Sequence, residues 1–493
     1  MIRSPYRSLF LAAAVFLAAA VSPARAAVFI PTKLTDSADG ACDADCSLRE
    51  AVLAANDAAG PDFIVLGAGV YTLSLAGVSE DQAATGDLDV TDDLAIVGRD
   101  AAGTVIDAGK IDRVIDVLAG VRLEIVGLTL RNGAARNGLA GAEGGGIRVA
   151  GELELTRGVV RDSVATKGGG IAGIGEAAVL DIDQSTILQN ISSEQGGGIY
   201  VESTLELINS TLSGNAAQLL GGGGLYATDD AVGTVSNSTI HLNSVVSGQG
   251  GGVYVDNVPF ISIAHPVFEN SIVAGNTAGA ATEKDCFGSA NSAGHNLLGV
   301  GNGCDDFGPH PGDLEGTAGA PLDPKLLPLA ATGGPTPVHR PNTGSPAIDH
   351  GSGCEPVDQR GAARSAVACE IGSVEVTGQC ISGGPALCLN RSRFQVLVTW
   401  TTATGTGAGQ AIQLTDESGF FTFFDPSNVE LTVKVLNGCG LGGRYWVFLS
   451  GLTNVGVQVT VTDTQTGATK TYNNPINKTF APVLDTNAFA TCP

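Results

Sequence analysis

The chain has 493 residues, with 50 acidic and 26 basic side chains and a formal net charge of −24 at pH 7. This charge argues against nucleic acid or anionic membrane surfaces as partners, because phosphate groups are bound by clustered Lys and Arg. The 69 glycines and the low fraction of charged residues, 15%, fit a β-rich protein of two or three domains.

Residues 1–26 have the pattern of a secretory signal peptide. Arg3 and Arg7 precede an apolar run from Leu9 to Val21, and Ala24-Arg25-Ala26 forms a small-residue cleavage site. The run is too short to cross a bilayer, and we expect no membrane-spanning segment in the mature chain. The mature chain is expected to begin at Ala27 and to be secreted or held at the cell surface.

The ten cysteines, an even number in an exported chain, predict disulfides rather than metal ligands. Their positions suggest three local pairs, Cys42–Cys46, Cys286–Cys304 and Cys354–Cys369. The last four cysteines allow three pairings that the sequence does not separate: Cys380, Cys388, Cys439 and Cys492.

A helix is predicted from Ser47 to about Asp57. Ser47 is a good N-cap residue, and Glu50 stands at the third helical position, which together make a capping box. Gly60-Pro61 then ends the helix. The acidic stretch from Ser79 to Asp93 is expected to project outward as a loop.

The hexapeptide Cys46-Ser47-Leu48-Arg49-Glu50-Ala51 resembles the motif of CSLREA-domain proteins, which are secreted bacterial proteins with right-handed parallel β-helices. The preceding residues 39–43 also match that pattern. The resemblance implies that residues 27–62 form an N-terminal cap over the open end of a solenoid, where strand edges are unpaired. Arg49 and Glu50 are expected to be structural rather than catalytic.

A glycine triplet followed by an apolar residue occurs five times between Gly144 and Val255. The last glycines of the triplets are 24, 28, 26 and 28 residues apart, and such a period is typical of a solenoid. Residues 63–376 are therefore predicted to form a parallel β-helix. The glycines suit a tight corner with positive φ, and no G-x-x-x-x-G-K-[ST] phosphate loop is present.

A second repeated phrase ends in asparagine. Asn190, Asn215, Asn243 and Asn276 predict a ladder of stacked amides, and the position three residues earlier is apolar in every repeat, so it should face the core. Together the two phrases are similar to the repeats of polymorphic outer-membrane proteins, which implies a parallel β-helix.

Nine positions before the asparagine, an acidic residue stands between apolar neighbours. The alternation places Glu154, Asp181 and Glu206 on the outer face, one per coil, and Asp183 shares the face with Asp181. Like charges about 5 Å apart repel each other. The column is therefore either screened by solvent or bridged by a cation such as Ca²⁺, the one cofactor that the sequence suggests.

A second outward column directly follows the triplets and contains Tyr200, Tyr226 and Tyr254. Three stacked tyrosines on an outer face suit a sugar-binding platform. The alternative is that the rings pack against one another or against a covering loop.

Residues 285–376 resemble the terminal coils of the choice-of-anchor Q family through several ordered motifs, among them 333–337, 345–349 and 358–361. The family name implies a surface protein. Asp349, Asp358 and Arg360 are expected to form an ion-pair network there. From residue 380 to 493, strands that alternate at period two predict an antiparallel β-sandwich with an aromatic core that includes Phe421.

The sequence thus predicts a non-catalytic secreted or cell-surface protein for adhesion, glycan binding or surface structure. The alternative is a lyase or hydrolase that acts on acidic polysaccharide, with the carboxylates of the acidic column beside Arg161 or Lys167 as a base. An extracellular glycan or cell-surface component is the expected partner.

Overall fold

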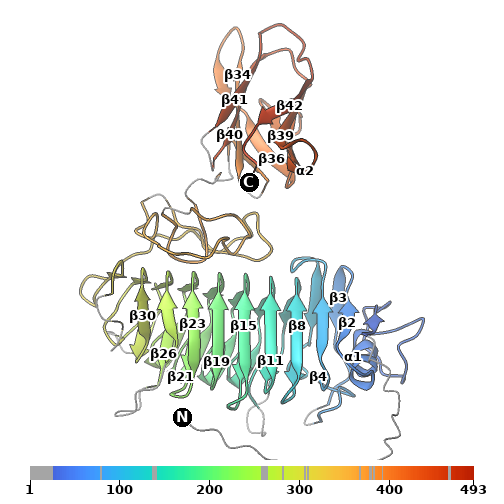
Figure 1. Ribbon diagram of the computed structural model, residues 1–493, viewed down its shortest axis with the longest axis vertical. Helices are drawn as coiled ribbons and strands as arrows, with labels where there is room; N and C mark the ends of the chain where they lie inside the picture. Colours follow the sequence, from blue (N-terminus) through green and yellow to red (C-terminus); the bar gives the residue numbers. More distant parts are fainter. Residues whose placement is uncertain are drawn as a thin grey trace, which may run out of the picture.

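The computed structural model describes residues 26–492 except for 78–79, 136–141, 257–264, 280–282, 305–306, 308–309, 343, 366–367, 377–379, 381–383, 391 and 465–467. The predicted fold class is confirmed: a parallel β-solenoid is followed in the chain by antiparallel sheets (Figure 1). All but the last residue of the expected signal peptide lies outside the described residues.

Three long parallel sheets form the solenoid, and every coil except those at the two ends contributes one strand to each of them. The first sheet contains β1 (Val28–Phe29), β2 (Asp62–Val65), β5 (Leu94–Val97), β8 (Arg122–Val126), β11 (Glu152–Thr156), β15 (Val179–Asp183), β19 (Thr204–Ile208), β23 (Val232–Ser236), β27 (Val267–Glu269) and β30 (Asn291–Gly294). The second contains β4 (Leu88–Val90), β7 (Ile115–Val117), β10 (Ile147–Val149), β14 (Ile171–Gly173), β18 (Ile199–Val201), β22 (Leu225–Ala227), β26 (Val253–Val255) and β29 (Cys286–Gly288). The third contains β3 (Gly69–Thr72), β6 (Thr104–Asp107), β9 (Thr129–Arg131), β12 (Val159–Arg161), β16 (Thr186–Leu188), β20 (Thr211–Ser213), β24 (Thr239–His241), β28 (Ile272–Ala274), β31 (Leu297–Leu298) and β32 (Leu314–Glu315).

A fourth, shorter parallel sheet lies between the third and second sheets along the chain, in the middle coils only. The sequence did not predict it. Its strands are β13 (Val164–Lys167), β17 (Ile191–Gln195), β21 (Ala216–Gly221) and β25 (Ser244–Gln249).

The glycine triplets form tight corners, as predicted, and each lies directly before a strand of the second sheet. The first glycine of each triplet has positive φ, for example 63° at Gly196. The next glycine approaches the neighbouring coil so closely that a Cβ on Gly197 would lie 2.5 Å from the carbonyl oxygen of Gly223. The first glycine is therefore required by its backbone conformation, and the second by the lack of space for a side chain.

The asparagine ladder is present and fully buried. The Nδ2 atom of Asn190 donates to Oδ1 of Asn215 at 3.0 Å, and Asn215 donates in the same way to Asn243 at 2.9 Å. The ladder ends where Asn276 donates to Asp285 at 2.9 Å, a carboxyl whose pKa is raised to about 6 by burial. Each amide thus ties two coils together in the interior.

The N-terminal cap contains the predicted helix, α1 (Leu48–Asp57), with its capping box intact. Arg49, the second residue of this helix, is buried, and its guanidinium pairs with Asp36 at 2.9 Å. The expectation of a projecting loop at 79–93 is wrong for its second half, because Leu88 and Val90 insert into the core and residues 88–90 form a strand of the second sheet, whereas the described residues before them form a loop in which Asp81 is exposed.

The last part of the solenoid region differs from the expected stack of terminal coils. From about residue 323 the chain runs back along the third sheet (Figure 1); we call residues 323–376 the strap. Within it, Gln359 contacts Thr211 at 2.6 Å, and Ser373 contacts Thr239 at 3.0 Å. The strap therefore spans several coils instead of adding new ones.

A buried ion pair between Asp358 and Arg360, 2.7 Å apart, holds the strap together. The expected third member, Asp349, is exposed in a surface turn and takes no part. The backbone of Glu375 contacts the pair instead, because its N–H donates to Asp358 and its carbonyl accepts from Arg360.

His339 gives the strap a predictable dependence on pH. Its ring is 1% exposed, with Nδ1 bound to the Leu327 carbonyl and Nε2 to the Ser213 hydroxyl, and burial lowers its pKa to about 4. In the unfolded chain His339 binds a proton near pH 6.5, whereas in the folded chain it does so only near pH 4. The free energy of unfolding should therefore decrease as the pH falls from 6.5 to 4.

In urea unfolding, the loss in unfolding free energy between pH 7 and pH 4.5 should be about 2.5 kcal/mol larger for the natural chain than for His339→Gln. Equal losses in the two chains would contradict the assigned role of His339.

The C-terminal module is a β-sandwich of two antiparallel sheets with its own core. One sheet contains β33 (Ala386–Leu389), β34 (Phe394–Thr401), β35 (Thr406–Ala408), β40 (Gly456–Asp463) and β41 (Thr469–Asn474), and the other contains β36 (Gln410–Thr415), β37 (Ser418–Thr422), β38 (Leu431–Gly438), β39 (Arg444–Gly451) and β42 (Val483–Phe489). A short helix, α2 (Cys439–Gly442), joins β38 to β39. Phe421 is in the core as expected, whereas Phe424 is 57% exposed, so the aromatic run is only partly interior.

Five disulfides are present. The three local pairs suggested by the sequence are bonded, and the remaining four cysteines pair as Cys380–Cys388 and Cys439–Cys492. Within the described part of the chain, no helix has the length and apolar character needed to cross a membrane.

Candidate functional site

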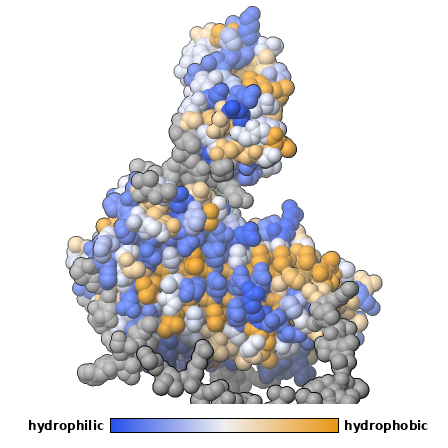
Figure 2. Space-filling view, in the orientation of Figure 1, coloured by the Kyte–Doolittle hydropathy of each residue, from blue (hydrophilic) through white to orange (hydrophobic). Residues whose placement is uncertain are grey.

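The acidic column lies on the outer face of the first sheet, one carboxylate per coil. Glu154 stands opposite Asp181 on the adjacent strand, and Asp181 stands opposite Glu206. Asp183, two residues further along β15, is on the same face and half-buried. Figure 2 shows this face, on which hydrophobic residues gather toward the N-terminal coils and hydrophilic ones toward the middle.

Arg122 compensates part of the charge of this column. Its guanidinium pairs with Glu152 at 3.2 Å and also contacts Glu154. Burial, and next the charges of Glu154 and Glu206, raise the pKa of Asp181. Among the described residues, these carboxylates do not form a set of three whose oxygens lie within 4.8 Å of one another. The suggested Ca²⁺ site at this column stays a prediction.

The bases proposed for catalysis do not face the acidic column. Arg161 is on the third sheet and pairs with Asp162 at 2.6 Å, while Lys167 is on the fourth sheet, 3.3 Å from the Tyr200 hydroxyl. The expectation that either residue joins the carboxylates is wrong, because sequence neighbours around a corner of the solenoid point to different faces.

The three tyrosines form a stacked ladder on the outer side of the second sheet. The ring centroids of Tyr200 and Tyr226 are 5.6 Å apart, and those of Tyr226 and Tyr254 are 4.8 Å apart. Phe287 continues the stack. The rings are aligned by the parallel register of β18, β22 and β26.

The tyrosine ladder is not an open platform. Tyr200 and Tyr226 are only 3% and 4% exposed, and their hydroxyls donate to Glu202 and Asp256. Tyr254 is half-buried. Of the two readings of this column, the structure therefore favours rings that pack against one another over a sugar-binding surface.

An exposed apolar surface is present on the fourth sheet. Its outward side carries four exposed large aliphatic side chains, namely Ile191, Leu219, Leu220 and Val246, with exposed fractions of 42–59%. Its strands contain two charged residues of opposite sign, Lys167 and Glu194, in a chain with a net charge of −24. We call this the fourth-sheet face.

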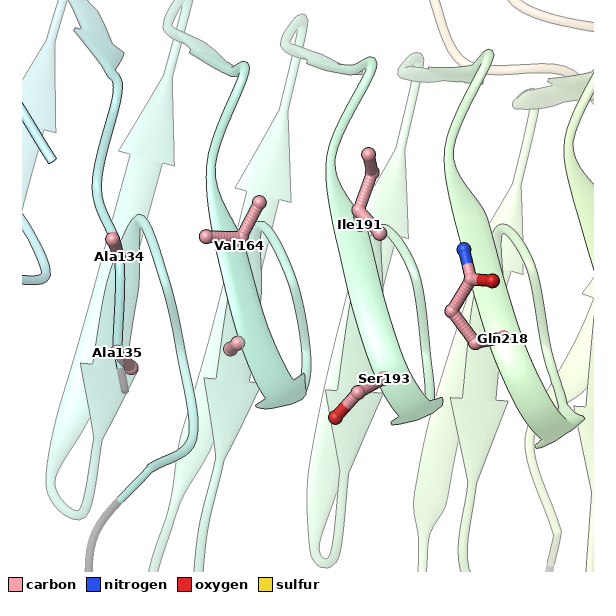
Figure 3. Close-up of a pocket in the computed structure, with 7 residues that line it drawn as sticks. Ala134, Ala135, Val164, Ile191, Ser193 and Gln218 are labelled. Atoms are coloured by element: carbon pink, nitrogen blue, oxygen red, sulfur yellow. The ribbon is translucent and has the colours of Figure 1, made fainter. Parts of the chain in front are cut away.

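A shallow hollow of about 290 Å³ opens on the N-terminal half of this face (Figure 3). Ala134, Val164 and Ile191 supply apolar walls from successive coils, and Ser193 and Gln218 present a hydroxyl and an amide at its edge. Small residues at Ala134 and Ala135 leave the space that larger side chains would fill. The hollow can accept a group that is partly apolar and partly hydroxylated.

The outward column of the second sheet extends beyond the tyrosines in the N-terminal direction. Arg148 on β10 pairs with Asp116 on β7 at 3.1 Å, and Asp116 stands opposite Asp89 on β4. Burial raises the pKa of Asp89 to about 8. The sequence reading missed these two aspartates. The signal was present, since Leu88-Asp89-Val90 and Ile115-Asp116-Val117 share the apolar–Asp–apolar pattern of buried strands.

Comparison with protein-family models, with curated proteins and with solved structures gives no match to this chain. The resemblances to the CSLREA and choice-of-anchor Q families therefore remain interpretations of the motifs. The motifs do have a physical role in this structure. Arg49 of the first organises the cap, and Gln359 of the second joins the strap to the solenoid.

Proposed function

We propose that this is a non-catalytic secreted or cell-surface protein of the CSLREA and choice-of-anchor Q type that acts in adhesion. In this proposal it binds an uncharged glycan along the fourth-sheet face. The observation that carries the proposal is the exposed, nearly uncharged strip on four parallel strands of an otherwise strongly acidic chain. The five disulfides fit an extracellular setting.

The chemistry of the face suits a neutral sugar chain. Aliphatic side chains cover the apolar side of a sugar ring, while Gln218 and Ser193 offer an amide and a hydroxyl group to its hydroxyls. Because parallel coils repeat these groups along the axis, an extended ligand meets similar contacts on successive coils. The net charge of the chain repels acidic polysaccharides.

The prediction is that Leu219→Glu weakens binding of a soluble neutral polysaccharide by about tenfold or more, because the new charge must lose water on binding. Affinity electrophoresis through gels containing the polysaccharide measures this. Leu484→Glu is the matched control, since Leu484 is 74% exposed on the sandwich. Equal retardation of both variants and the natural chain would count against the face as the binding site.

One observation supports a second candidate, a lyase or hydrolase for acidic polysaccharide. On the first sheet a guanidinium, that of Arg122, contacts Glu154, and the neighbouring Asp181 has a raised pKa, as a general acid requires. Release of reducing or unsaturated ends by the natural chain, lost in Asp181→Ala, would establish this activity. The non-catalytic proposal requires that no such product is formed.

A further inference from the structure

Three carboxylates converge at the N-terminal end of the second sheet. Asp81 comes from the loop before β4, Asp89 from β4 itself and Asp116 from β7. One carboxylate oxygen from each lies within 4.8 Å of the others. In the described part of the chain, no other set of three acidic, histidine or cysteine ligands meets this distance.

Two of these carboxylates are buried beside each other. Asp89 is 0% and Asp116 is 6% exposed, and they stand directly opposite on adjacent parallel strands. Like charges at such a position destabilise a sheet unless something compensates them. The Oδ2 atom of Asp89 accepts from the Ala83 N–H at 2.6 Å, whereas Oδ1 is buried with no hydrogen-bond donor among the described residues. This oxygen lacks an electropositive partner.

The surrounding cations leave negative charge in excess. Arg148 pairs with Asp116 at 3.1 Å, and Arg113 pairs with the adjacent Asp87 at 2.7 Å. At least four carboxylates therefore face two guanidinium groups, a formal excess of at least two negative charges, and Arg148 is shared with Glu143 at 3.9 Å. The nearby carboxylates of Glu80 and Asp112 accept backbone N–H groups of Thr85 and Arg113 and increase the excess of negative charge.

We propose that Asp81, Asp89 and Asp116 bind one Ca²⁺ ion beside the N-terminal cap, at the first strands of the second sheet. Its charge balances the excess, and carboxylate oxygens are its preferred ligands. Asp81 is exposed, so water can reach the ion and complete its shell. Ca²⁺ accepts the irregular geometry of two strands and a loop more readily than the smaller Mg²⁺ does.

The ion would also fix the loop that holds Arg49. The carbonyls of Ala83, Gly86 and Asp87 accept the Arg49 guanidinium, and all three belong to the segment between Asp81 and Asp89. Ca²⁺ binding therefore stabilises the cap against opening, and this effect appears as a rise in melting temperature.

The test is a Ca²⁺ titration of the chelator-treated full chain, followed by calorimetry and thermal unfolding. We expect one site, half-saturated at roughly 10⁻⁴–10⁻³ M as in other extracellular modules, with a saturable rise in Tm. Asp89→Asn, which keeps the acceptor for Ala83, should abolish the rise. Asp81→Asn changes only an exposed loop residue and should weaken binding about tenfold or more without affecting the fold.

Asp181→Asn in the acidic column is the matched control and should retain the full response to Ca²⁺. No response in the natural chain would overturn the proposal, and protons would then compensate the buried pair. A response that persists in both Asp81→Asn and Asp89→Asn, or that is lost in Asp181→Asn instead, would equally overturn it and place the ion elsewhere.

Discussion

Replacing Arg49 with methionine should lower the free energy of unfolding by about 3–5 kcal/mol, the cost of breaking a buried ion pair. All five N–H groups of the guanidinium are used, by the two carboxylate oxygens of Asp36 and by three backbone carbonyls. Methionine fills similar space but leaves the buried Asp36 charge unpaired. Urea unfolding of the full chain measures the loss.

The control for this variant is Arg99→Met. Arg99 also pairs with an aspartate, Asp100, at 3.6 Å, but its side chain is 73% exposed. A surface pair contributes about 0–1 kcal/mol, so the control should unfold close to the natural chain. If the two variants lost equal stability, the buried network of Arg49 would contribute no more to the free energy of unfolding than a surface ion pair does.

The second large effect is expected at the centre of the asparagine ladder. Asn215→Leu removes an amide that accepts from the backbone and side chain of Asn190 and donates to Asn243 and to the Ile187 carbonyl. Several buried polar groups lose their partner at once, and each costs about 1–3 kcal/mol. We expect a total loss of at least about 3 kcal/mol, measured by urea unfolding.

Gln218→Ala serves as the comparison, because Gln218 lies three residues after Asn215 and its side-chain amide is exposed on the fourth-sheet face. It should change stability by less than about 0.5 kcal/mol. A loss in Asn215→Leu as small as that in Gln218→Ala would mean that water or a shift of the coils replaces the ladder bonds.

The solenoid could be predicted from the sequence because its constraints are local and periodic. The glycine corners, the inward Ile187 and Leu212, and the ladder asparagines each repeat once per coil, and the parallel register then aligns whatever lies between them. The acidic and tyrosine columns follow from that alignment alone. Periodicity thus determines to which side of a strand a residue points.

Periodicity does not determine what covers that side. The tyrosines point outward as predicted, but Tyr200 and Tyr226 are buried, and the ammonium group of Lys167 lies over the ring of Tyr200. The fourth sheet was missed because its strands mix Ser, Gln and Gly with apolar residues. The strap contact between Thr211 and Gln359 joins residues 148 positions apart, which no repeat pattern reveals. The aspartate pair was missed because the acidic composition of its segment suggested a solvent-exposed loop.

The strap changes how the molecule carries mechanical load. A stack of coils that is held only by neighbours opens from its free end, one coil at a time. Here the chain leaves the solenoid region at Glu375, beside Asp358, which is itself bound to Gln184 on the coil of β15 and β16. Tension applied through the C-terminal sandwich therefore enters at a middle coil, and the bonds of the strap to several coils must yield before the last coil can peel away.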